Sequence, residues 1–122
     1  MTYGSFEDLE VWQKSCDLAV NIYQALKDCR DYGFRDQICR SAVSIPSNVA
    51  EGMERDSGKE RIHFLHIAKG SSAELRTQLL IAERIGILNS QMAQSYRDEG
   101  VHISRMLHGL IKALQNKPSP AP

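Results

Sequence analysis

Four stretches of the sequence carry apolar residues at alternating spacings of three and four, and this pattern constrains the fold more than any other feature. Such spacing places the apolar side chains on one face of an α-helix. The predicted core positions are Leu9, Trp12, Cys16, Ala19, Tyr23 and Leu26; Ile38, Ala42, Ile45 and Val49; Leu65, Ala68, Ser72, Leu75, Leu79 and Ala82; and Tyr96, Gly100, Ile103, Leu107, Leu110 and Leu114. No stretch shows the two-residue alternation of a half-buried strand.

Polar residues before these stretches supply the helix starts. Ser5 is the expected N-cap of the first helix, Asp56 or Ser57 of the third, and Asn89 or Ser90 of the fourth. All three connections are short, so each helix must turn back against its predecessor. The sequence therefore predicts an all-α fold, an antiparallel up-down-up-down four-helix bundle over residues 1–115. The proline-rich tail, 116–122, is predicted to be disordered.

The second helix is unusual because Pro46 lies in its middle. An internal proline removes a backbone hydrogen bond and clashes with the preceding turn, so a proline-kinked second helix is predicted. Small residues gather on this helix and on the third, where Gly70 stands mid-helix. We expect them to mark a close approach of the two helices; a ligand slot between the helices is the alternative.

Composition excludes several classes of protein. The fifteen basic and fifteen acidic side chains cancel, so no overall field draws the chain to a membrane or a nucleic acid. No apolar run approaches the ~20 residues of a membrane span, and the acidic start after Met1 does not resemble a signal peptide. The three cysteines lack Cys-x-x-Cys spacing. A cytoplasmic protein without a disulfide framework or zinc knuckle is expected.

Two Glu-x-x-His pairs match part of the ligand pattern of a di-iron site. They are Glu60 with His63 and Glu99 with His102, and Glu10 and Glu51 could complete the ligand set. In the predicted bundle the pairs lie about fifteen residues apart along the axis, roughly 20 Å, which one metal cluster cannot bridge. His63 and His66 alone form a weak metal motif, and no nucleophile motif occurs. We therefore predict no metal, no cofactor, no small-molecule substrate and no enzymatic activity.

Basic residues crowd the middle of the chain, and a second apolar stripe runs beside some of the seams. The basic side chains usually form an ordinary solvated face, but in an assembly they could form a stripe that contacts nucleic acid. The candidate contacts are Arg40, Arg55, Lys59, Arg61 and Lys69. The additional apolar residues are Val11, Leu18, Ile22, Ile81 and Ile85. Because a monomeric bundle needs one stripe per helix, these residues predict an association surface.

Three motifs carry a resemblance to a known family. They are Phe6-x-x-Leu9-x-Val11-Trp12-Gln13, the run from Ala42 to Gly52, and Phe64-Leu65-x-Ile67-Ala68-x-Gly70-Ser71 followed by Glu74-Leu75-x-Thr77-Gln78-Leu79. Over about residues 5 to 114 the chain resembles the 23S rRNA intervening-sequence proteins of bacteria, also called the S23 family, which are similar in fold to the accessory variability proteins of diversity-generating retroelements. The resemblance implies a homopentamer of four-helix bundles without known catalytic activity. It also implies an association with RNA or an RNA-handling partner.

Two hypotheses of function follow. The first is a non-enzymatic oligomeric bundle that binds structured RNA or a ribonucleoprotein partner. The second is a protein–protein interaction scaffold without nucleic-acid binding, which the neutral net charge favours because electrostatics supplies most non-specific affinity for phosphate backbones. A basic stripe on the surface would favour the first hypothesis, and an apolar or mixed-charge channel the second.

Overall fold

Polar caps and apolar seams produce four long helices in the computed structural model, which describes residues 5–116. A short 3-10 helix, η1 (Phe6–Asp8), precedes α1 (Glu10–Ala25), α2 (Tyr32–Met53), α3 (Gly58–Arg84) and α4 (Ser90–Gln115). The described residues contain no strand, so the all-helical, four-helix prediction is confirmed. Asn116 caps the end of α4; the rest of the tail that we predict to be disordered, 117–122, lies outside the described residues.

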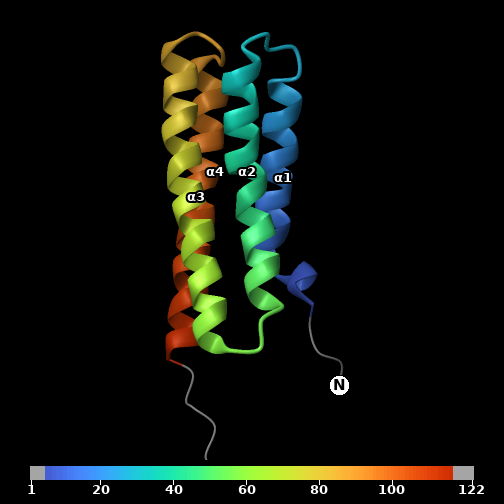
Figure 1. The fold of residues 1–122 in the computed structure, drawn as a ribbon. Coiled ribbons are helices and arrows are strands. Elements are labelled where there is room, and N and C mark those ends of the chain that lie inside the picture. The colour runs from blue at the N-terminus through green and yellow to red at the C-terminus, as the bar shows by residue number, and fades with distance from the viewer. Residues whose placement is uncertain (1–4, 117–122) are drawn as a thin grey trace, which may run out of the picture.

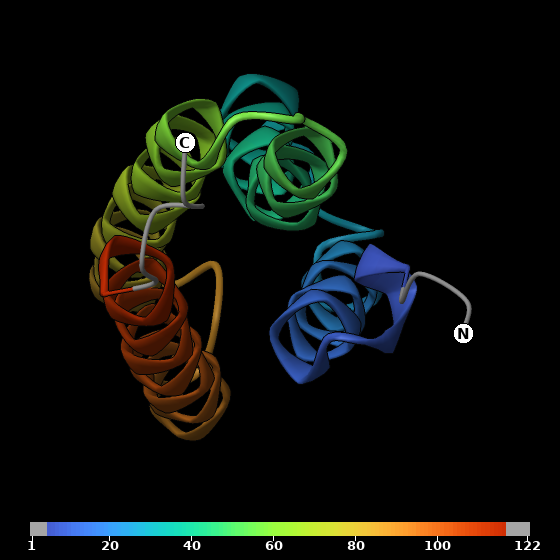
Figure 2. The same ribbon diagram turned by 90° about the horizontal axis from the view of Figure 1, so that it is seen from below.

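The helices lie side by side, with their connections at alternate ends of the long axis (Figure 1). Viewed along that axis, they form a four-sided arrangement in the order α1, α2, α3, α4 (Figure 2). The contacts of α3 with α2 and with α4 are the most extensive. In Figure 1 the α1–α2 and α3–α4 connections lie at one end of the bundle, and the α2–α3 connection lies at the other end, on the side of η1.

The predicted caps are confirmed for α3 and α4 and differ for α1. Ser57 accepts a hydrogen bond from the backbone N–H of Glu60, and Asn89 accepts one from that of Met92. Ser5 caps η1 instead of the first α-helix, because its hydroxyl bonds the N–H of Glu7 and the chain passes through extended backbone at Leu9 before α1 begins.

The core contains the predicted seams of α2 and α3 in full, but only Leu26 of the seam predicted for the first helix is buried, and its other positions were predicted wrongly. The core face of α1 is built by Val11, Ser15, Leu18 and Ile22, together with Leu26 just beyond the helix. The prediction that Val11, Leu18 and Ile22 belong to an association surface is therefore wrong, because the bundle's own core buries them. Tyr23 is 60% exposed, and the other predicted positions apart from Leu26 are half-buried. Both stripes of α1 have the same spacing. Burying the large side chains of Leu18 and Ile22 removes more apolar surface from water than burying Cys16 and Ala19 would.

Side-chain hydroxyls join α2, α3 and α4 near mid-height. The Ser44 and Ser71 hydroxyls lie 2.8 Å apart, and Ser41 donates to Glu74 Oε1 at 3.0 Å. The Ser72 hydroxyl donates to the carbonyl of Gly100 at 3.1 Å and lies 2.8 Å from that of Ser104. We call these five serines, 41, 44, 71, 72 and 104, the hydroxyl belt. Small polar residues therefore mark helix packing between α2 and α3, as expected.

Gly70 is not part of that packing, contrary to prediction. No heavy atom lies within 4 Å of where its Cβ would stand, and the residue is exposed. The close approaches occur at Gly52, where a Cβ would lie 2.8 Å from Phe64 Cβ, and at Gly100, where it would lie 2.9 Å from Arg76 Cγ. The helix α2 runs through Pro46 as one helix, and the kink at this residue stays a prediction.

Candidate nucleic-acid interface

The five basic residues predicted as nucleic-acid contacts do not form one surface. Arg55, Lys59 and Arg61 lie at the α2–α3 connection, at one end of the bundle. Lys69 lies on α3, where its Nζ is 3.3 Å from His108 Nδ1 of α4. Arg40 is exposed on α2. The structure thus gathers three of the five and places Lys69 on a different face.

Two of the three arginines and lysines at the α2–α3 connection already have structural partners. Arg55 pairs with Glu51 at 2.8 Å and lies over the ring of Phe64, 4.8 Å from its centroid. Arg61 Nε donates to the backbone carbonyl of Arg55 at 2.7 Å. These contacts fasten the turn between the helices. The corner is also rich in acids, since Glu54, Asp56 and Glu60 stand beside the basic residues in the sequence.

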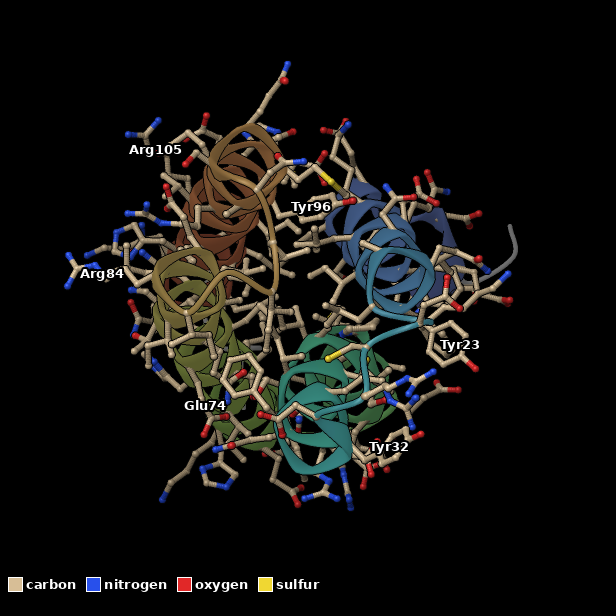
Figure 3. All side chains as sticks on the ribbon, turned by 90° about the horizontal axis from the view of Figure 1, so that it is seen from above. Tyr23, Tyr32, Glu74, Arg84, Tyr96 and Arg105 are labelled. Carbon is tan, nitrogen blue, oxygen red and sulfur yellow. The ribbon has the colours of Figure 1, made fainter. Side chains whose placement is uncertain are left out.

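A larger basic surface lies on the outer side of α3 and α4. It consists of Lys69, Arg76 and Arg84 on α3 and Arg97, Arg105 and Lys112 on α4, and we call it the α3–α4 basic face. Contacts across the two helices align the two rows: Arg76 Nη2 lies 3.3 Å from Ser104 Oγ, and Arg97 Nη1 lies 4.0 Å from Glu83 Oε1. Arg84 and Arg105 project outward on the same side of the bundle (Figure 3).

Arg76 is held in place at the centre of this face. Its aliphatic stem crosses α4 at Gly100, where any side chain would collide with Cγ and Cδ. Its Nε donates to the carbonyl of Ser72 at 3.3 Å, and Nη2 reaches Ser104. Arg76 makes no ion pair with another described residue. A positioned guanidinium without an acidic partner suits the binding of an anionic group.

Charge is segregated although the chain is neutral overall. Six basic residues stand on the α3–α4 basic face, where the neighbouring acids are Glu83, which pairs with Arg97, and Asp98 at the edge of α4. Apart from these residues, the described part of the chain holds eight basic and thirteen acidic residues, so the formal charge is +4 on this face and −5 on the rest of residues 5–116. Net charge therefore conceals a basic surface.

A groove of about 340 Å³ runs between the two rows of cations. Ala73, Leu80 and Val101 contribute its apolar part, and Arg76 and Arg97 flank it. Thr77 also lines the groove, but its hydroxyl donates to the carbonyl of Ala73 in its own helix at 3.0 Å. Gln94 and Asp98 line it as well and are joined by a hydrogen bond of 2.8 Å. The groove thus offers cations at its edges, while its other polar side chains bind groups of their own helix.

Residues 7–109 match the family described as 23S rRNA-intervening sequence protein. The chain belongs to this family. A member of the S23 ribosomal protein family from Bacteroides thetaiotaomicron VPI-5482, a crystal structure of a protein with unknown function, is similar in fold with a TM-score of 0.78 and 27% identity. The similarity covers 84% of the present chain and 98% of that one. No curated protein matches the sequence.

This S23-family chain carries a sequence signal for the basic face that the analysis of its charges missed. On the third helix, Lys69 and Arg76 are seven residues apart and Arg84 follows Arg76 by eight. On the fourth helix, Arg97 precedes Arg105 by eight, and Arg105 and Lys112 are seven apart. Such spacing keeps side chains on one side of a helix. The five candidates were instead grouped by closeness in the sequence, which places successive residues on different sides.

The two Glu-x-x-His pairs of the present chain lie on different faces of its bundle. Glu60 and His63 line a surface hollow at the α2–α3 corner. Glu99 and His102 line a cleft of about 460 Å³ between α1 and α4, with Asp17 opposite. No group of three or more His, Cys, Asp or Glu side chains within residues 5–116 is arranged to hold a metal ion.

The remaining features are an apolar groove and the free cysteines. The groove lies between α1 and α2 and measures about 450 Å³; Phe6, Trp12, Cys16 and Pro46 are among its lining residues. All three cysteines are free and half-buried. Burial raises the pKa of the Cys16 and Cys39 thiols, which disfavours reactive thiolates. Within the described part, no helix is long and apolar enough to cross a membrane.

Proposed function

We propose that this S23-family chain is a non-enzymatic, oligomeric, up-down-up-down bundle with antiparallel neighbouring helices, and that it binds structured RNA in the cytoplasm, free or within a ribonucleoprotein partner. The observation that carries the proposal is the charge segregation: a formal +4 on the α3–α4 basic face of a chain with no net charge. Each phosphate contact made by a cation releases condensed counterions, which is the main source of sequence-independent affinity for nucleic acids.

The proposed contact surface, the α3–α4 basic face, differs from the set of residues predicted from the sequence. Lys69 stays a contact, since it lies on the α3–α4 basic face. Lys59 is exposed and can contribute at the end of α3. Arg55 and Arg61 fasten the α2–α3 connection, so replacing them would confuse loss of binding with loss of structure. Arg105 and Lys112 are better probes because both are exposed and neither forms an ion pair within the described residues.

Fluorescence anisotropy with a labelled RNA hairpin tests the proposal. The variant Arg105→Gln with Lys112→Gln is compared with a control, Lys27→Gln with Arg30→Gln, which removes two exposed charges near the α1–α2 connection. The slope of log affinity against log salt should fall by about 1.4 to 1.8 in the first variant, at 0.7 to 0.9 per phosphate contact, and stay unchanged in the control. Equal effects of both variants, or no binding at 50 mM salt, would reject the α3–α4 basic face as an RNA site.

The apolar groove between α1 and α2 favours a second candidate, a protein–protein interaction scaffold, and also supports self-association. Val20 and Val43 line this groove while 57% and 53% exposed. The family resemblance implies a homopentamer. Light scattering coupled to size exclusion should give a pentamer for the wild type and a smaller species for Val43→Gln. An oligomer that binds no RNA would support the scaffold.

A further inference from the structure

We propose that the α3–α4 basic face binds the sugar–phosphate backbone of double-stranded RNA across its minor groove and does not bind unpaired bases. This inference rests on the proposed RNA-binding function and narrows it to one class of RNA.

The large rings that could stack on unpaired bases lie elsewhere, and the His108 imidazole, which is beside the face, lies 3.3 Å from Lys69 Nζ. Single-stranded RNA is held largely by stacking of splayed bases on aromatic side chains. Within residues 5–116, no Phe, Tyr or Trp is among the residues of the α3–α4 basic face or its groove. Phe6 and Trp12 line the α1–α2 groove, and Phe64 packs at Gly52 of α2. Tyr23 and Tyr32 lie on the α1–α2 side, and Tyr96 points from α4 toward α1 (Figure 3).

Three of the six cations of the face contact neighbouring side chains that orient them, which suits a rigid ligand. Arg76 is fixed by Ser72 and Ser104, Arg97 by Glu83, and Lys69 by the imidazole of His108. The row on α3 extends from Lys69 to Arg84, about 22 Å at 1.5 Å per residue. A duplex keeps its phosphates at constant spacing along such a length, whereas a single strand must lose conformational entropy to match it.

The groove between the rows has the chemistry of a backbone site. Base edges are read by free donors and acceptors, but Ala73, Leu80 and Val101 offer none and the Thr77 hydroxyl is bound within α3. The two other polar residues of the lining bind neighbours on α4: the Gln94 amide donates to Asp98 Oδ1 at 2.8 Å, and its oxygen accepts from Arg97 at 3.5 Å. Arg76 and Arg97 at the edges can each pair with a phosphate, while the apolar floor lies against the sugar. Contacts of this kind are independent of sequence.

The width of the face distinguishes RNA from DNA. Two neighbouring helices, about 8–10 Å between axes and each about 10 Å across, present a surface of about 20 Å. The major groove of B-form DNA is about 12 Å wide and admits one helix. The minor groove of A-form RNA is wide and shallow and displays 2′-hydroxyls beside its phosphates, so a flat pair of helices can lie across it.

The test measures the affinity of the wild-type protein for four probes at fixed salt: a 16-base-pair RNA duplex, each of its two strands alone, and the DNA duplex of the same sequence. We expect the RNA duplex to bind at least tenfold more tightly than either strand and than the DNA duplex. Equal or tighter binding of a single strand, or of DNA, would overturn the assignment to double-stranded RNA. Absence of binding to every RNA would instead reject the proposed function itself.

A matched pair of variants tests the groove without changing charge. Ala73→Gln places a longer side chain in the groove, and Ala113→Gln adds the same side chain to another exposed position of the pair of helices, turned away from α3 by the helical repeat. Both residues are good helix formers, so both variants should fold, as circular dichroism would verify. We expect Ala73→Gln to weaken duplex binding at least fivefold with an unchanged salt slope, and Ala113→Gln to have no effect. Unchanged binding by Ala73→Gln would refute the groove as the contact.

Discussion

Replacing Gly52 by alanine should destabilise the bundle, although alanine is the better helix former. The added Cβ would lie 2.8 Å from Phe64 Cβ and 3.2 Å from the backbone carbonyl oxygen of Arg61. Neither is the end of a flexible side chain, so α2 and α3 must separate locally. Overpacking of this kind costs about 1–3 kcal/mol, and the gain in helix propensity offsets at most about 1 kcal/mol of it.

Gly70→Ala is the matched control, because that position has open space within 4 Å and lies in the interior of α3. It should raise the free energy of unfolding by about 1 kcal/mol. The steric cost at Gly52 therefore appears as a difference of about 1–3 kcal/mol between the two variants. This difference corresponds to roughly 4–12 °C in Tm for a domain of this size.

Urea denaturation followed by circular dichroism at 222 nm measures both variants, with unchanged m-values as evidence that only stability changed. If Gly52→Ala is as stable as Gly70→Ala, the close contact of α2 with Phe64 and Arg61 does not exist as described. The reasoning about which glycines carry packing would then be refuted.

Three further predictions follow from contacts within the bundle. Gly100→Ala should destabilise the wild type, because the added Cβ collides with the Arg76 side chain. In the Arg76→Ala variant the collision is absent, so the same change should stabilise the protein by about 1 kcal/mol. Additive changes in the free energy of unfolding across this double-mutant cycle, measured by urea denaturation, would contradict the prediction. Gln78 is buried with an unpaired Oε1, so Gln78→Met should stabilise by about 1 kcal/mol in the same assay, and a loss of stability would show that the amide has a partner. Burial raises the pKa of the Cys16 and Cys39 thiols in the folded protein, so these thiols ionise at lower pH when unfolded, and the free energy of unfolding should decline as pH rises above about 9. The double variant Cys16→Ala, Cys39→Ala should show a smaller decline in urea unfolding measured across this pH range. Identical declines in the wild type and the variant would argue against the shift.

The fold was predictable from the sequence because its signals are local. Alternating spacing identifies a helix, and Ser57 and Asn89 cap helices with the residue types expected there. The core face of α1 was not predicted correctly, since two apolar stripes on it have the same spacing. Only packing against the other helices separates the large buried pair, Leu18 and Ile22, from the stripe that lines the α1–α2 groove.

The candidate interface was harder to predict because it depends on how two helices align. The seven-residue spacing of Lys69 and Arg76 is visible in the sequence, but whether they face Arg97 and Arg105 depends on the axial position of α4 against α3. Likewise, a mid-helix glycine looks the same in the sequence whether it packs closely, as Gly100 does, or faces solvent, as Gly70 does.

The hydroxyl belt has a consequence for the vertical alignment of the bundle. Leucine and alanine repeat along the seam of α3, so a helix shifted by one turn would still bury apolar side chains. A slip of one turn, about 5.4 Å, would take the buried Ser72 hydroxyl away from Gly100 and Ser104, at about 1–3 kcal/mol for the unsatisfied group. The hydrogen bonds of these serines thus hold α3 and α4 in one register. The spacing of positive charges that a ligand meets on the surface is set by neutral hydroxyls inside the bundle.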